Sequence, residues 1–209
     1  MPPFPLPRTR PAAPRRTTAA ALLTVVGLAV AGCSGSDSSA PAAGGSAPPA
    51  ARSVATKVTI GTVAGNVRRP FRKTFAQHRP HLEKQVGAAV DSWLDGGFVG
   101  VDYPRGSFPT AFAAFSSSAK HDARRQQKLL TNWTWRRDID GVTTKHRTVV
   151  LDVLAPRGRP AGVTARVRLV FTTSGDVRKR VTVSGRLFLA QDRHGDWRIF
   201  GYDVAKGAK

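Results

Sequence analysis

A change in hydrophobic period near residue 133 constrains the fold of this chain more than any other feature. Before it, apolar residues recur every three or four positions; after it, they alternate with polar residues, as in β-strands. The alternating segments are 133–139, 145–154, 163–172, 177–191 and 196–204. Short turn sequences separate them, and tight turns join antiparallel neighbours. We therefore expect an antiparallel meander in the second half of the chain.

Helical periodicity is clearest in residues 81–94, where Leu82, Val86, Val90 and Trp93 fall on one face. Pro80 suits the first turn of this helix, and the glycine pair at 96–97 suits its end.

Weaker patterns flank this helix. Residues 108–115 and 119–130 predict two further short helices, the second capped by the serines at 116–118. Residues 58–67 could form a first strand, although two glycines interrupt it.

Helices followed by strands indicate an α+β fold, with N-terminal helices packed on a curved antiparallel sheet. This element order, over residues 57–205, resembles the NTF2-like fold, in which a curved sheet wraps helices into a cone with a pocket. The closing segments 185–189 and 197–204 look like the terminal strands of that fold. They are also similar to uncharacterised lipoproteins and Mce-associated accessory proteins of high-GC Gram-positive bacteria. A strand before the first helix departs from the usual NTF2-like pattern, and residues 206–209 are expected to form a tail.

The N-terminus has the features of an export signal. Four arginines lie between residues 8 and 16, and an apolar, small-residue stretch follows at 17–32. This stretch is shorter than the roughly 20 apolar residues of a membrane-spanning helix, so residues 1–32 predict a signal peptide. The pair Arg15-Arg16 leaves a twin-arginine route open beside general secretion, although the residues that follow fit that route poorly.

The end of the apolar stretch, Val30-Ala31-Gly32-Cys33, resembles a bacterial lipobox. This resemblance implies cleavage before Cys33 and attachment of diacylglycerol, with fatty-acyl chains such as palmitate, to its sulfur. Cys33 is the only cysteine, which excludes an internal disulfide or a thiolate metal cluster. The expected location is the extracytoplasmic face of the cell membrane, because two acyl chains anchor stably.

Residues 33–56 then predict the lipidated cysteine and a tether rich in Ser, Gly, Ala and Pro, with little to bury. As a flexible coil, the 23 residues from 34 to 56 reach roughly 25–30 Å.

The chain is strongly basic, with 33 Lys and Arg against 13 Asp and Glu. A product beginning at Cys33 keeps a net charge of +16, which attracts anions. Strand alternation places five arginines on one solvent-facing surface: Arg166, Arg168, Arg178, Arg180 and Arg186. Two interpretations remain open, contact with anionic lipid or wall polymer, and a simply solvated face.

The sequence contains no recognisable catalytic constellation. The carboxylates and hydroxyls of Asp91, Asp102, Tyr103, Tyr202 and Asp203 form no clear acid–base pair. His78 and His81 lie three apart, but Pro80 separates them and no carboxylate stands at helical spacing, so we expect no metal site. We therefore expect a non-enzymatic protein without a cofactor.

The NTF2-like resemblance nevertheless implies a cone that can hold a ligand. Asp102 and Tyr103 would lie at its mouth, with Trp133 and Trp135 near its wall. Tryptophans more often fill a core than grip a ligand, and the core interpretation of these two is the favoured one.

Two hypotheses follow. The first is a membrane-anchored lipoprotein that binds a protein partner in the membrane, anionic lipid or wall polymer. The alternative is a small-ligand binder or enzyme using the interior of the cone. Related folds often dimerise through the sheet, which makes a homodimer an option. Nucleic acid is not an expected partner, because export separates the protein from it and no nucleic-acid motif is present.

Overall fold

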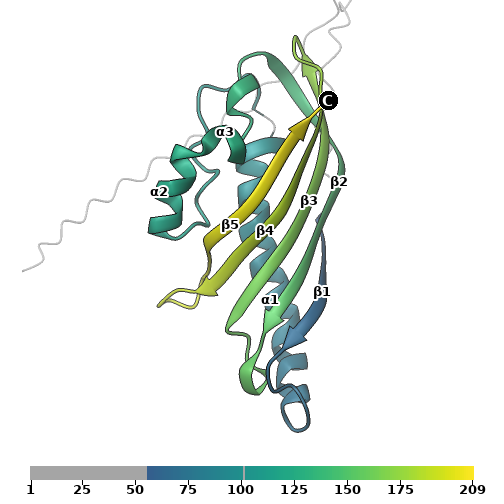
Figure 1. The fold of residues 1–209 in the computed structure, drawn as a ribbon, viewed down its shortest axis with the longest axis vertical. Coiled ribbons are helices and arrows are strands. Elements are labelled where there is room, and N and C mark those ends of the chain that lie inside the picture. The colour runs from purple at the N-terminus through teal and green to yellow at the C-terminus, as the bar shows by residue number, and fades with distance from the viewer. Residues whose placement is uncertain (1–55, 101) are drawn as a thin grey trace, which may run out of the picture. The chain divides into compact units, whose positions relative to one another are not determined.

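The computed structural model describes residues 56–100 and 102–209, in which a five-stranded sheet packs against a long helix (Figure 1). The strands lie side by side in chain order. They are β1 (Lys57–Ala64), β2 (Ile139–Leu154), β3 (Gly162–Gly175), β4 (Arg180–Gln191) and β5 (Trp197–Ala208). The α+β class is therefore confirmed. The last strand continues past residue 205, where the domain was expected to end.

The helices lie on one face of the sheet. They are α1 (Phe71–Leu94), α2 (Ser117–Arg125) and α3 (Gln127–Leu130), with short helical turns η1 (Asp95–Val99), η2 (Trp133–Trp135) and η3 (Pro156–Gly158). Helix α1 runs along the sheet, and α2 and α3 lie beside its upper part in Figure 1. Within the described ranges, no helix covers the opposite face, which we call the outer face.

The core lies between α1 and the inner face of the sheet. Leu82, Val86, Val90 and Trp93 are at most 2% exposed, as the helical periodicity predicted. Trp93 and Phe98 meet edge to face with ring centres 5.6 Å apart. The Trp93 indole nitrogen donates to the Leu130 carbonyl oxygen at 3.0 Å, so the buried polar atom is paired.

The sheet is mixed, which corrects the prediction of a wholly antiparallel one. Strand β1 pairs in parallel with β2, whereas the other three pairs are antiparallel. The reason is that α1 and the segment after it carry the chain back between β1 and β2, and such crossovers produce parallel neighbours. Nor do all helices precede the strands, since β1 comes before α1 and η3 lies between β2 and β3.

Helix α1 is longer than predicted, because it begins at Phe71 and contains Pro80 in its interior. An interior proline removes one backbone hydrogen bond and normally interrupts a helix. Here the first turn of α1 packs directly on η3: a side chain at Gly158 would collide with the Phe71 carbonyl oxygen. This contact holds the N-terminal turns in place on the far side of the proline.

A strand was predicted over 133–139, but residues 133–138 form η2 and a turn, and β2 begins only at Ile139. Thr131 Oγ1 accepts from the Trp133 backbone N–H at 3.1 Å, and such local side-chain bonds compete with sheet pairing. The Asn132 amide donates to the distant Phe98 carbonyl oxygen at 2.9 Å, which holds the turn against η1.

The segment 108–115 forms turns and not the predicted helix, and it packs so closely on Gly96 that a Cβ there would lie 2.7 Å from Ala111 Cα. The predicted helix at 119–130 is divided at Gln126 into α2 and α3. Its predicted cap is confirmed, because Ser116 Oγ accepts from the Ala119 backbone N–H at 3.3 Å.

A buried arginine joins the sheet to the C-terminal end of α1. The Arg147 side chain, on the inner face of β2, is only 3% exposed, and its two terminal nitrogens lie 2.6 Å from carboxylate oxygens of Asp91 and Asp95. Thr56 Oγ1 donates to the same Asp91 oxygen at 2.5 Å. Carboxylates are unfavourable near the C-terminus of a helix, because the helix dipole is negative there. The Arg147 guanidinium offsets the negative charges of both carboxylates, and they supply the counter-charge that the buried guanidinium requires.

Replacing both carboxylates tests this arrangement. We expect Asp91→Asn with Asp95→Asn to lower the free energy of unfolding by about 3 kcal/mol, because a buried guanidinium is left without a counter-charge. Arg147→Met should cost much less, since it removes the buried charge and leaves carboxylates that reach solvent. Urea unfolding measures both. A larger loss for Arg147→Met than for the double variant would contradict the account.

Candidate functional site

The outer face of the sheet carries four of the five predicted arginines. Arg166 and Arg168 on β3 lie beside Arg186 and Ser184 on β4, and Arg180 lies opposite Thr172. Arg178 is the exception: it lies before β4 begins, and its Nε donates to the Gly175 carbonyl oxygen at 3.4 Å. Strand alternation predicted these faces correctly, whereas the start of β4 was misplaced.

Two of these arginines are partly neutralised by acids on neighbouring strands. Arg166 Nε lies 2.8 Å from Asp152 Oδ2, and Arg186 Nη2 lies 2.8 Å from Asp203 Oδ2. Arg166 and Arg186 are directly opposite each other across two strands, so these acids relieve a like-charge contact. The arginines of the outer face are therefore only partly available to a bound anion.

A second cationic surface, which sequence reasoning missed, lies at the end of the domain opposite the C-terminus (Figure 1). It is formed by the loop between β1 and α1 together with η3. We call it the basic end, and its six exposed members are Arg68, Arg69, Arg72, Lys73, Arg157 and Arg159. Its two segments come together because η3 packs on the first turn of α1.

The basic end differs from the outer face in having no ion-paired carboxylate among the described residues. No Asp or Glu side chain in the described part of the chain forms an ion pair with any of its six cations. A hollow of about 650 Å³ lies against it, lined in part by Arg69, Arg72 and Lys73. The cluster was visible in the sequence as closely spaced basic residues at 68–73. Only the fold adds Arg157 in η3 and Arg159 directly after it.

Three of the four residues predicted to line a cone, Tyr103, Trp133 and Trp135, make side-chain contacts with neighbouring residues or segments. Asp102 is exposed, whereas Tyr103 is half-buried and its hydroxyl donates to the Phe98 carbonyl oxygen at 2.9 Å. The Asn132 amide donates to that hydroxyl at 2.8 Å, and burial raises the pKa of Tyr103. The Arg136 guanidinium packs over Trp133, with its Cζ atom 3.8 Å from the centre of the indole ring. These contacts join loop 102–108 to the segment 131–136.

Trp135 belongs to a separate contact with the last strand. The Lys206 ammonium lies 5.3 Å from its ring centre and donates to the backbone carbonyl oxygens of Lys128 and Thr131. Burial lowers the pKa of Lys206 from 10.5 to about 8. This lysine fastens β5 to α3, a role that the sequence did not indicate.

The lowered pKa of Lys206 makes stability depend on pH. Between about pH 8 and 10.5 the unfolded chain binds more protons at this group than the folded chain, so the free energy of unfolding rises with pH. Urea unfolding at about pH 7.5 and 9.5 should show wild type gaining stability relative to Lys206→Met. Parallel changes in the two proteins would show that Lys206 does not titrate in this range.

The predicted catalytic candidates are mostly engaged in structural contacts. Asp91 pairs with Arg147 and Asp203 with Arg186. The Tyr202 hydroxyl is buried without a hydrogen-bond partner among the described residues, and burial, followed by the charge of Asp122, raises its pKa. These groups are not brought together at one site.

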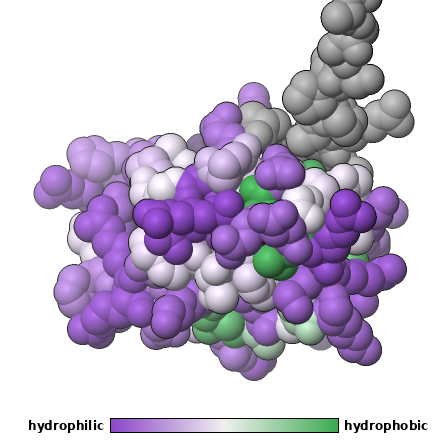
Figure 2. Space-filling view, turned by 90° about the horizontal axis from the view of Figure 1, so that it is seen from above, coloured by the Kyte–Doolittle hydropathy of each residue, from purple (hydrophilic) through white to green (hydrophobic). Residues whose placement is uncertain are grey.

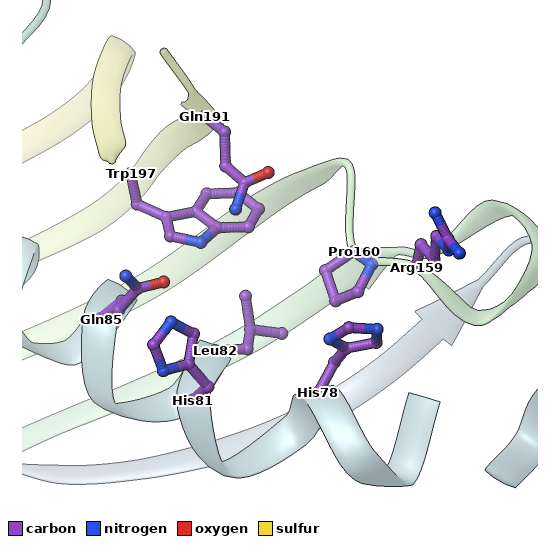
Figure 3. Close-up of a pocket in the computed structure, with 8 residues that line it drawn as sticks. All are labelled: His78, His81, Leu82, Gln85, Arg159, Pro160, Gln191 and Trp197. Carbon is purple, nitrogen blue, oxygen red and sulfur yellow. The ribbon is translucent and has the colours of Figure 1, made fainter. Parts of the chain in front are cut away.

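A cleft of about 390 Å³ opens beside α1, where the helix faces the β2–β3 connection and the β4–β5 turn (Figure 3). His78 and His81 line it from the helix, and Arg159 and Trp197 from the sheet side. The sequence predicted that a helix begins at about Pro80, between these two histidines. In the structure α1 continues through Pro80, so His78 and His81 lie on the same helix and line the same cleft.

Little apolar surface is visible at the end of the domain that carries the C-terminus. Figure 2 shows the end that carries the C-terminus as largely hydrophilic, with hydrophobic residues in small separate patches. Leu154 and Phe200 are the large apolar side chains most exposed among the described residues, at 52% and 55%. Neither forms a broad apolar surface by itself.

The chain matches no protein-family model, and no curated protein or solved structure matches it significantly. None of the helices in the described ranges is both long and apolar enough to cross a membrane. Cys33, the predicted signal peptide and most of the predicted tether lie outside the described residues.

Proposed function

We propose that this protein is a non-enzymatic lipoprotein of the cell envelope, anchored through Cys33 and holding its basic end against anionic phospholipid. The observation that carries the proposal is the group of six exposed cations without a described carboxylate partner. Like charges gathered at one end repel one another, and an anionic surface offsets that repulsion. Each basic residue near such a bilayer contributes about 1 kcal/mol.

The length of the tether permits this orientation. Strand β1 begins at Lys57 and leads to the basic end over 8 residues, which at a strand rise of 3.3 Å is about 26 Å. A tether from residue 34 to 56 reaches roughly 25–30 Å. An anchored Cys33 therefore allows the basic end to reach the membrane to which the chain is attached.

The domain itself is proposed to be a variant of the NTF2-like fold. Its support is the order of elements and the placement of α1 on one face of the sheet. The parallel strand β1 is an addition to that pattern. Trp93, Phe98 and Phe171 fill the space under α1 with fully buried rings, which favours a surface role over the alternative of an interior ligand site.

Removing the acyl acceptor tests the anchor. We expect Cys33→Ala to move the protein from the membrane fraction to the soluble extracytoplasmic fraction, because no acyl chains are attached. Intact-mass analysis of the wild type should show loss of residues 1–32 and a gain of diacylglycerol. A wild-type mass equal to that of the unprocessed chain would refute the anchor.

Binding to vesicles tests the basic end. The segment from residue 34 to 209, made without acyl chains, should bind vesicles of phosphatidylglycerol and phosphatidylcholine at about 0.1 M salt. Neutralising Arg68, Arg69, Arg72 and Lys73 to Gln should weaken binding by about a thousandfold, if each contributes about 1 kcal/mol.

The matched control neutralises the four arginines of the outer face, at 166, 168, 180 and 186. We expect a smaller loss, because acids already pair with two of them. If the outer-face variant lost binding and the basic-end variant retained it, the outer face would be the membrane-contacting surface. Equal binding of wild type to neutral vesicles would remove the electrostatic basis of the proposal.

A further inference from the structure

The cleft beside α1 has the composition of a binding site for a small anion. Three basic side chains line it: His78 and His81, one turn apart on α1, and Arg159 after η3. Figure 3 shows both imidazole rings directed from the helix into the cleft, below Pro160 and Trp197. No carboxylate is among its described lining residues. Its volume of about 390 Å³ suits a small ligand.

The two ends of the cleft differ in chemistry. His78 and Arg159 supply N–H donors at one end, and guanidinium groups suit carboxylate and phosphate oxygens. Gln85 and Gln191 supply amides at the other end, beside Trp197. His78 and Gln85 are seven residues apart, which is about 10 Å along a helix. A ligand that spans the cleft therefore needs an anionic end and a neutral polar end.

One buried polar atom at the neutral end has no hydrogen-bond partner among the described residues. Gln85 Oε1 is buried and accepts no hydrogen bond from a described residue. An unmade bond of this kind costs about 1–3 kcal/mol. Gln85 as a whole is only half-buried, and its side chain lines the cleft. In Figure 3 the Trp197 indole nitrogen faces the side where His81 and Leu82 lie.

We propose that this cleft binds a hydroxylated small molecule with a phosphate or carboxylate group, of the size of a sugar phosphate or sugar acid. The oxyanion lies between His78, His81 and Arg159. A hydroxyl group donates to Gln85 Oε1, and another accepts from the Trp197 indole N–H. Trp197 is 5% exposed and held at the start of β5, so this donor is fixed before the ligand arrives.

Isothermal titration of the full chain, purified from membranes in neutral detergent, tests the proposal. The probes are glucose 6-phosphate, glucuronate, glucose and inorganic phosphate. We expect glucose 6-phosphate, glucuronate or both to bind, and to bind more tightly than glucose or inorganic phosphate. The two anionic sugars distinguish a phosphate from a carboxylate ligand.

Variants locate the binding. His78→Gln with Arg159→Gln should weaken it at least tenfold, because hydrogen bonds from the charged Arg159 guanidinium are lost. His121→Gln with Arg124→Gln, which removes exposed basic side chains from α2, should leave it unchanged. Gln85→Leu should weaken sugar-phosphate binding and spare inorganic phosphate.

Three results would overturn the proposal: no binding of either anionic sugar, equal weakening by the cleft and α2 variants, or inorganic phosphate binding as tightly as glucose 6-phosphate. Arg159 belongs to both surfaces, but these titrations contain no anionic lipid and Gln85→Leu leaves the basic end intact, so failure here is separable from failure of the membrane proposal.

Discussion

The ion pairs between Arg147 and the carboxylates of Asp91 and Asp95 determine how the helix lies on the sheet. A guanidinium buried on the inner face of β2 requires counter-charges, and among the described residues Asp91 in the last turn of α1 and Asp95 at the start of η1 supply them. Apolar attraction is non-directional, whereas these ion pairs join defined atoms of the helix end and the sheet. Arg147 therefore fixes where the end of α1 lies along β2.

That position matters because α1 carries groups of both proposed surfaces. Its first turn contributes Arg72 and Lys73 to the basic end, and the next turns present His78, His81 and Gln85 to the cleft. The β2–β3 connection completes both surfaces with Arg157 and Arg159. Fixing the far end of one long helix therefore arranges two sites at its near end, and η3 secures the near end by packing on the first turn.

The sequence was sufficient to predict the structure of a segment where one hydrophobic period, helical or β, runs through it. It predicted the inner faces of β3 and β4, the apolar face of α1 and the cap at Ser116, because each depends on nearby residues. It failed where distant residues decide the backbone: the parallel pairing of β1, the passage of α1 through Pro80, and the turn at Asn132. The same distinction explains the site. Arginines on one strand face were predictable, whereas the basic end and the cleft join segments about 80 residues apart.

The central claim is one of orientation, and distance from the bilayer measures it directly. Spin labels at Ala76→Cys, beside the basic end, and at Ala208→Cys, at the opposite end of the sheet, can be compared on the lipid-anchored protein in anionic vesicles that carry a nickel-chelating lipid. The account predicts faster relaxation of the label at position 76, because that end faces the headgroups. Equal relaxation at both positions, or faster relaxation at position 208, would contradict it.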